Sequence, residues 1–133
     1  MKKKILITGG TGFIGSGITK YLVNQGHEVT VLDNNFRGKS SRISDVIKKV
    51  KFIKGDIRNR ELVFKSLKNV NCVIHLAFVN GTRFFYERPI DVLEIGVKGI
   101  INIIDGCIKH KIKEVFLASS SEVYHSPKKI PTT

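Results

Sequence analysis

The feature that most constrains this chain is a glycine-rich turn that follows directly after a short apolar segment. Residues 4–8, Lys-Ile-Leu-Ile-Thr, are followed by Gly9, Gly12 and Gly15 and then by a segment with helical periodicity. A strand that ends in such a turn and leads into a helix is typical of a phosphate-binding motif. One glycine permits a sharp turn at positive φ, one lets the backbone approach a pyrophosphate, and one lets the helix pack closely on the strand. The alternative is a strand–helix connection that merely requires glycine.

Short apolar segments alternate with longer amphipathic ones along the chain, which predicts a parallel sheet with helices on both faces. Strands are predicted at 4–8, 28–32, 50–54, 72–76 and 114–118, and helices at 13–25, 43–49, 60–67 and 89–109. Gly26 is the predicted C-terminal cap of the first helix, and Pro89 the predicted start of the last. Beyond Tyr124 the chain is polar and carries two prolines, which predicts irregular structure.

Length and composition predict a single domain. The 133 residues can bury one core but are too few for a dinucleotide fold and a separate substrate domain. No apolar segment approaches the ~20 residues that span a bilayer, and none near the N-terminus is long enough for a signal peptide. We therefore expect a cytoplasmic protein with no membrane partner. Cys72 and Cys107 are predicted to be buried thiols, and the four histidines show no metal-ligand spacing, so no metal site is predicted.

The net charge of +12 raises nucleic-acid binding as a hypothesis. The lysines, however, are scattered along the chain in pairs such as Lys48-Lys49, and the few aromatic residues do not interleave with them. This pattern favours solvated surface lysines, so no nucleic-acid partner is predicted. A modest positive field would still favour capture of an anionic nucleotide.

Asp33 ends the second predicted strand, where a carboxylate can accept hydrogen bonds from the hydroxyls of an adenosine ribose. The same carboxylate repels a 2′-phosphate, so it favours NAD over NADP. Arg37 acts in the opposite sense, because an arginine there can pair with a 2′-phosphate. The alternative for Asp33 is a turn-forming residue before Asn34-Asn35.

Two further segments follow predicted strands at the edge where open α/β sheets bind ligands. Asp56, in Gly55-Asp56-Ile57, can accept from an adenine amino group while Ile57 packs against the ring. Asp56 also suits a helix N-cap. Ala77 is small enough for the backbone to lie close to a bound cofactor, although the end of a core strand is the simpler interpretation.

These motifs together resemble the extended short-chain dehydrogenase/reductase superfamily, specifically its NAD-dependent nucleotide-sugar epimerases, dehydratases and decarboxylases. The residues that carry the resemblance, in order, are 8–15, Asp33, 55–57, 75–77 and 119–124. The resemblance covers essentially the whole chain and implies a Rossmann-like, doubly wound α/β sheet of about five strands in the order 3-2-1-4-5. It corresponds to the N-terminal half of such enzymes, residues 1–133 forming a single NAD-binding domain that is incomplete relative to the family. The residues it implies for cofactor binding are Gly9, Gly12, Phe13, Ile14, Gly15, Asp33, Asn34, Arg37, Asp56, Ile57, Leu76, Ala77 and Ser119.

Enzymes of this family hold NAD and oxidise a sugar carbon, usually C4, to a ketone that permits epimerisation, dehydration or decarboxylation. The resemblance implies that Ser120 hydrogen-bonds the sugar hydroxyl that loses its proton. Glu122 is implied as a further acid or base, with a solvent-facing glutamate as the alternative. The implied partners are a nucleotide-sugar substrate in the complete enzyme and a second copy of the chain.

Two departures from the family pattern stand out. Gly96 occupies the place of an asparagine in the family's Asn-x-x-Gly. The catalytic Tyr-x-x-x-Lys helix is missing, since the literal match Tyr124 to Lys128 is interrupted by Pro127, which is incompatible with one helical face. We therefore expect weak activity or none from this chain alone, with exposed apolar residues such as Ile100, Ile101 and Ile104 promoting self-association. The alternative is a non-catalytic module that senses NAD or docks on a partner subunit.

Overall fold

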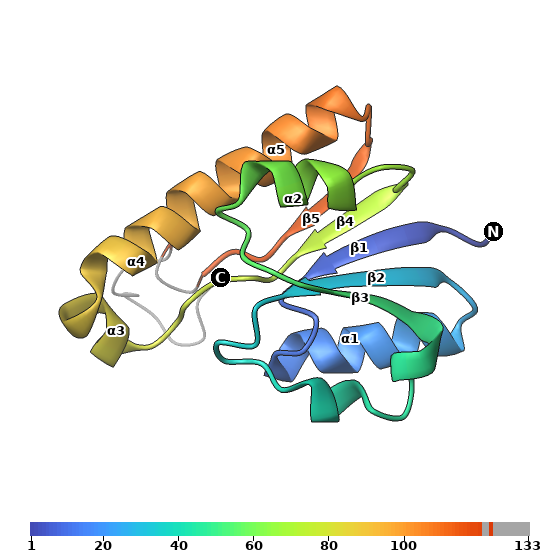
Figure 1. Cartoon of the computed structure of the whole chain (residues 1–133), viewed down its shortest axis with the longest axis horizontal. Coiled ribbons are helices and arrows are strands. Elements are labelled where there is room, and N and C mark those ends of the chain that lie inside the picture. The colour runs from blue at the N-terminus through green and yellow to red at the C-terminus, as the bar shows by residue number, and fades with distance from the viewer. Residues whose placement is uncertain (121–122, 124–133) are drawn as a thin grey trace, which may run out of the picture.

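The protein folds around a five-stranded, wholly parallel sheet, seen in a computed structural model that describes residues 1–120 and 123. The strands, in chain order, are β1 (Lys4–Thr8), β2 (Glu28–Asp33), β3 (Val50–Lys54), β4 (Cys72–His75) and β5 (Glu114–Leu117). Their order across the sheet is β3-β2-β1-β4-β5 (Figure 1), which confirms the predicted fold class. From β1 the chain adds β2 and β3 on one side, and then β4 and β5 on the other side. The strand order therefore reverses between β1 and β4, which is the topological switch point where ligands bind in such folds.

Helices cover the sheet on both faces. The α1 helix (Phe13–Asn24) lies on one face, and α2 (Arg60–Ser66) and α5 (Gly99–Lys109) lie on the other (Figure 1). A hydrophobic core lies on each face of the sheet, because successive side chains of β1 point to opposite faces. Ile5 and Ile7 pack in the same core as Val23 of α1, whereas Leu6 packs in the same core as Ile103 of α5. A central strand buried on both faces explains the unbroken apolar sequence of β1.

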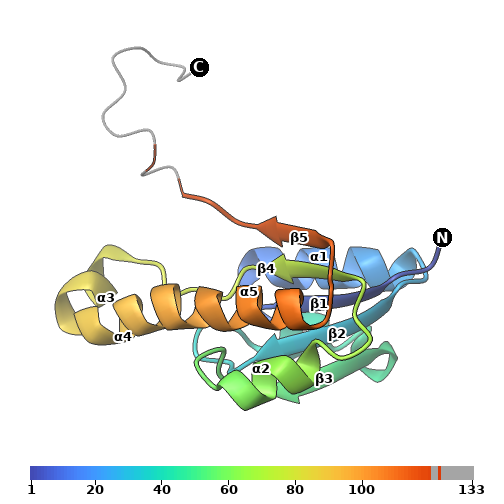
Figure 2. The same cartoon turned by 90° about the horizontal axis from the view of Figure 1, so that it is seen from above.

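The helical run before β5 has the predicted bounds, residues 89–109, but is less regular than predicted. It begins with α4 (Pro89–Leu93), continues through a π-helical segment (Glu94–Lys98) and ends with α5 (Figure 2). The ring of Phe78 packs against Gly96 in the π-helical segment, where an added Cβ would lie 3.0 Å from Phe78 Cε2. The space that a family asparagine would need is thus taken by an aromatic ring.

Two connections differ from the sequence prediction. The predicted helix at 43–49 is wrong: two 3₁₀ turns, Ser40–Ile43 and Ile47–Lys49, stand there instead. The short α3 helix (Thr82–Glu87) was not predicted, because it buries none of its residues and so carries no apolar periodicity. It begins after Gly81, whose φ of 127° only glycine adopts without strain.

Caps fix the ends of two helices. Gly26, at φ 82°, follows the end of α1, as predicted for its C-terminal cap. The N-cap of α2 is Asn59, whose side chain accepts a hydrogen bond from Leu62 N at 3.0 Å. Asp56 is therefore not the cap of this helix, and its carboxylate serves another contact.

The far edge of the sheet leaves apolar surface exposed. All four residues of β5 are exposed, and so are Ile101 and Ile104 on α5, as predicted, whereas Ile100 is half-buried. Cys72 and Cys107 are buried free thiols, and burial raises the pKa of each. Within residues 1–120 and 123, no helix combines the length and the apolarity needed to cross a membrane.

Candidate dinucleotide-binding site

The glycine-rich turn between β1 and α1 is held by close backbone contacts. Gly9 has a φ of +72°, and a Cβ there would lie 2.9 Å from the backbone nitrogen of Ala77. Gly12 N donates to Gly9 O at 3.0 Å. A Cβ on Gly15 would overlap that same carbonyl oxygen. The turn therefore needs glycine at Gly9 for its conformation and at Gly15 for the close approach of helix and strand.

The first turn of α1 has no side-chain cap. Gly12 is its N-cap and provides no side-chain acceptor, so the first N–H groups of the helix, at Phe13, Ile14 and Gly15, have no cap partner. The side chains of Phe13 and Ile14 are exposed. These residues can therefore contribute to an anion site only through backbone N–H groups and the helix dipole.

A cleft of about 550 Å³, counting its open mouth, lies at the carboxyl edge of the sheet beside this turn. Nine of the predicted cofactor-binding residues line it: Gly9, Gly12, Asp33, Asn34, Arg37, Asp56, Ile57, Leu76 and Ala77. Phe13, Ile14 and Gly15 lie next to it in the first turn of α1. Ser119 and Ser120 follow β5, are exposed and do not line the cleft. Glu122 lies outside the described residues.

The cleft also contains residues that sequence reasoning missed. They are Leu32, Phe36, Gly38, Gly55, Phe78, Val79 and Ile95. Most of them adjoin a recognised motif, so extending each motif by one or two residues would have found them. Ile95 is different, because it reaches the cleft from the π-helical segment and no local pattern marks it.

Asp33 is buried and anchors two loops. Its Oδ2 accepts from Thr11 N at 2.9 Å, and its Oδ1 accepts from Asn35 N at 2.8 Å. A carboxylate offers about four acceptor positions, so two remain for ribose hydroxyls. Both interpretations of Asp33 are thus compatible: it shapes the turn and keeps acceptors for a ligand. The Arg37 guanidinium lies 5.6 Å from the centre of the Phe84 ring.

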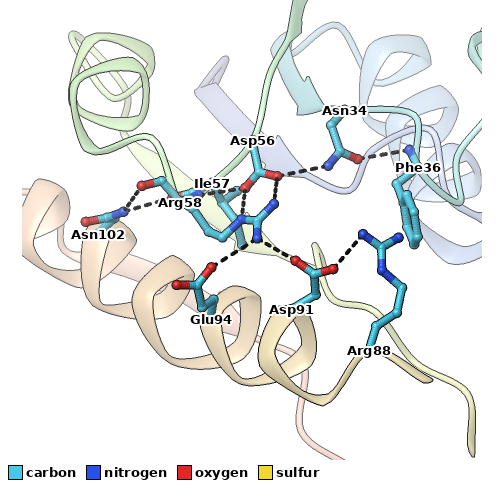
Figure 3. Close-up of polar contacts among 9 residues, drawn as sticks. All are labelled: Asn34, Phe36, Asp56, Ile57, Arg58, Arg88, Asp91, Glu94 and Asn102. Atoms are coloured by element: carbon cyan, nitrogen blue, oxygen red, sulfur yellow. Dashed lines mark hydrogen bonds and ion pairs between the residues drawn. The ribbon is translucent and has the colours of Figure 1, made fainter. Parts of the chain in front are cut away.

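Asp56 is surrounded by donors (Figure 3). Its carboxylate accepts from the backbone and guanidinium of Arg58 and from Asn34 Nδ2. Burial disfavours the charged form, but the hydrogen bonds and the charge of Arg58, with a smaller contribution from Asn34, outweigh it and lower the pKa of Asp56. The adjacent Ile57 is buried, and its side chain fills the space that a Cβ on Gly99 would take.

A buried hydrogen bond joins the ends of β1 and β4 beneath the cleft. The N–H of Leu76 is shared between the carbonyl oxygen of Thr8, at 3.1 Å, and its hydroxyl, at 3.2 Å. The hydroxyl also accepts from Ala77 N–H at 3.2 Å and lies 2.7 Å from His75 Nδ1. Both hydroxyl lone pairs are therefore used, so its proton is donated to Nδ1 of a neutral imidazole. Burial lowers the pKa of His75 to about 4, which keeps the ring neutral at physiological pH.

The parallel sheet, the switch-point cleft and the glycine turn at a helix N-terminus define a Rossmann-like dinucleotide-binding protein. Residues 5–133 match the family described as NAD dependent epimerase/dehydratase. The chain belongs to this family, and the resemblance and the fold class stated from its sequence are confirmed.

Individual relatives fit this assignment. The chain is 38% identical over 124 residues to the UDP-N-acetyl-alpha-D-glucosaminuronate decarboxylase of Bacillus cytotoxicus, covering 93% of itself and 38% of that protein. It is 39% identical over 129 residues to the putative UDP-glucose 4-epimerase of Methanocaldococcus jannaschii, covering 96% of itself and 41% of that protein. The chain thus spans about two fifths of the length of these relatives.

Solved structures show the same fold. The UDP-N-acetylglucosamine 4-epimerase of Methanobrevibacter ruminantium, in complex with UDP-N-acetylmuramic acid, superposes with a TM-score of 0.90 at 30% identity, over 100% of this chain and 43% of that one. The UDP-glucose 4-epimerase of Thermus thermophilus, in complex with NAD, superposes with a TM-score of 0.80 at 33% identity, over 88% and 37%. The expected cofactor, NAD, agrees with the family's description and with this relative.

Proposed function

We propose that this chain is the NAD-binding part of a nucleotide-sugar epimerase, dehydratase or decarboxylase that acts through a 4-keto sugar. The observation that carries the proposal is the switch-point cleft, which brings together nine of the thirteen residues predicted for the cofactor from separate motifs. Relatives named for UDP-sugar chemistry support the substrate class. NAD, when bound, would accept a hydride from the sugar carbon.

The residues present fit a dinucleotide. The first turn of α1 would bind the pyrophosphate, because Gly9 and the N-cap Gly12 line the cleft without side chains. Asp33 would accept from the adenosine ribose with its two remaining acceptor positions. Asp56 and Ile57 line the cleft on the β3 side, where the adenine would lie. The nicotinamide half would then extend toward β4, past Leu76 and Ala77, with Ser119 beyond.

Residues 1–133 offer few groups for proton transfer. Ser120, after β5, would hydrogen-bond the reacting hydroxyl, and Glu122 would serve as an additional acid or base. Within residues 1–133 the literal Tyr-x-x-x-Lys match, Tyr124 to Lys128, is interrupted by Pro127 and cannot present both side chains on one helical face. We therefore propose that residues 1–133 bind NAD and turn over a nucleotide sugar weakly or not at all by themselves.

The alternative is a non-catalytic module that senses NAD or docks on a partner subunit. The interruption of the Tyr124–Lys128 match by Pro127 supports it. One experiment distinguishes the two hypotheses: the protein is incubated with NAD and a UDP-sugar, and the sugar is then analysed by nuclear magnetic resonance. Epimerised, dehydrated or decarboxylated product supports the enzyme, whereas NAD binding without product favours the module.

Self-association is the proposed assembly. Exposed apolar side chains recur along the helical run from α4 to α5, at Ile90, Leu93, Val97, Ile101, Ile104 and Ile108. Their spacing of three or four residues places them on one stripe, hereafter the apolar stripe. A stripe of this length, next to the exposed β5, is typical of an interaction surface and supports a homo-oligomer.

The cofactor proposal is tested by calorimetric titration of the protein with NAD and with NADP. We expect NAD to bind more tightly, since Asp33 repels a 2′-phosphate. Asp33→Asn should weaken NAD binding about tenfold, the effect of one hydrogen bond to a charged group, and should affect NADP less. Asp45→Asn, which removes an exposed carboxylate paired with Lys20, is the matched control. Absence of binding by either nucleotide would overturn the proposal.

A further inference from the structure

One arginine connects the β3 side of the cleft to the long helical run. Arg58 Nε lies 3.1 Å from Asp56 Oδ1 and its Nη2 lies 2.9 Å from Asp56 Oδ2, while its backbone N–H donates to Oδ1 at 2.9 Å. Its Nη1 faces the other way, 2.9 Å from Asp91 Oδ1 and 3.3 Å from Glu94 Oε2 (Figure 3). The guanidinium therefore lies between the turn after β3 and the helices that follow Pro89.

The charges around Arg58 are balanced. Asp91 also pairs with Arg88, at 2.6 Å, and Glu94 also pairs with Lys98, so three carboxylates face three cations. The contact with Lys98, followed by that with Arg58, lowers the pKa of Glu94, and the hydrogen bond to Asp56 is the main cause that raises the pKa of Arg58. A half-buried arginine that binds a carboxylate through two nitrogens holds its geometry better than an isolated surface pair.

The backbone on either side of this contact is fixed as well. Asn102 of α5 donates from Nδ2 to the carbonyl oxygens of Ile57 and Arg58, at 3.0 and 3.1 Å (Figure 3). Asp56 is thus held by Arg58, and Arg58 is held by Asp91, Glu94 and Asn102.

This arrangement fills the acceptor positions of Asp56. A carboxylate offers about four. Arg58 occupies three of them, and Asn34 Nδ2 occupies the fourth at 3.2 Å, the longest of the four contacts. A bound adenine can donate its amino group to Asp56 only by displacing one donor. The exposed amide of Asn34 is the donor that can leave, because the three from Arg58 are fixed by the helices.

We propose that Arg58 is a positioning residue for adenine recognition: it holds Asp56 so that the acceptor position taken by Asn34 in the free protein is presented to the adenine amino group. The inference rests on the proposed binding of NAD. The contact with Asp56 distinguishes adenine from hypoxanthine, because hypoxanthine carries an oxygen where adenine carries the amino group. The glycine turn and Asp33 contact other parts of the dinucleotide and cannot make this distinction.

The experiment compares NAD with nicotinamide hypoxanthine dinucleotide, whose base carries an oxygen in place of the amino group. Calorimetry gives the ratio of the two dissociation constants for each protein. We expect the unmodified protein to prefer NAD, but by less than the about tenfold contribution of one hydrogen bond to a carboxylate, because the bond from Asn34 is lost when the amino group binds. Arg58→Met should bring the ratio close to one. Asn34→Ala should raise it, because the amino group then displaces no existing hydrogen bond.

Arg60→Met is the matched control, since Arg60 pairs with Asp105 of α5 and does not touch Asp56. It should keep the ratio of the unmodified protein. Arg58→Lys retains the charge but cannot bond to both Asp56 oxygens and the helix, so it should lower the ratio even if Arg58→Met does not fold. An unmodified protein that binds both nucleotides equally, or an Arg58 variant that keeps the full preference, would overturn the inference. An unmodified protein that binds neither would overturn the proposed function itself.

Discussion

The hydrogen bond between Thr8 and His75 fixes the chain segment that lies beneath the cleft. The Thr8 hydroxyl receives the N–H groups of Leu76 and Ala77, and Ala77 in turn lies against Gly9. The chain after β4 is thereby fixed to the end of β1. The contact depends on an unprotonated His75 Nδ1, because a protonated ring nitrogen could not accept the hydroxyl proton.

His75 should make stability depend on pH. Its pKa is about 4 in the folded protein, against about 6.5 in an unfolded chain, so between these values only the unfolded state binds the proton. The free energy of unfolding should therefore fall by about 3 kcal/mol as the pH is lowered from 6.5 to 4, and His75 should have no effect above 6.5. Urea unfolding at a series of pH values measures this slope.

The matched variant is His75→Asn, whose amide oxygen can still accept from Thr8 but does not titrate. Groups other than His75 contribute equally to both proteins, so the difference between the two curves isolates this residue. Parallel curves between pH 6.5 and 4 would show that His75 titrates normally in the folded state.

At the scale of one element, α1 contains two glycines with opposite steric surroundings. A Cβ on Gly15 would overlap the carbonyl oxygen of Gly9, whereas a Cβ on Gly17 meets no atom within 4 Å. Gly15→Ala should destabilise the protein by about 1–3 kcal/mol, because backbone must shift, and should weaken NAD binding. Gly17→Ala should stabilise it by about 0.5–1 kcal/mol through helix propensity. Urea unfolding and NAD titration of both variants check this, and equal effects would contradict the assigned role of Gly15.

The parts that could be predicted from sequence are those with local causes. The β1 strand, the turn at Gly9 and the position of Asp33 follow from apolar runs and glycines within a few residues of one another. The role of Arg58 could not be predicted, because its partners Asp91 and Glu94 come from a distant segment that only the fold brings close. The saturated carboxylate of Asp56 was not foreseen either, because the guanidinium of Arg58 that bonds to it is oriented by those distant partners.

Helices were harder to predict than strands for a related physical reason. The short α3 buries none of its residues and so produces no helical pattern in the sequence. The segment 43–49 does have a helical pattern, with Ile43 and Val46 buried, but it forms two 3₁₀ turns instead of one helix. The π-helical segment is in contact with a distant part of the chain, since the Phe78 ring that packs on Gly96 follows β4. The periodicity of a segment does not report its contacts with distant parts of the chain, so these helical elements could not be predicted from it.

At the scale of the whole molecule, two forces act on self-association in opposite directions. The apolar stripe and the exposed β5 favour contact between copies, since burying them removes apolar surface from water. The net charge of +12 opposes it through mutual repulsion. Salt screens the repulsion over about 10 Å at 0.1 M and leaves the apolar term in place. The molecule should therefore associate more strongly as the salt concentration rises.

Light scattering at increasing sodium chloride concentration tests this balance. We expect the mean mass to exceed that of the 14.9 kDa chain and to rise with salt. Ile104→Lys, in the middle of the apolar stripe, should lower the mass at every salt concentration, because it places a charge where apolar surface would be buried. Tyr21→Lys is the matched control: it adds the same charge at an exposed aromatic residue of α1, on the opposite face of the sheet, and should leave the mass unchanged. A monodisperse monomer at all salt concentrations, or equal effects of the two lysines, would show that the apolar stripe does not mediate association between copies.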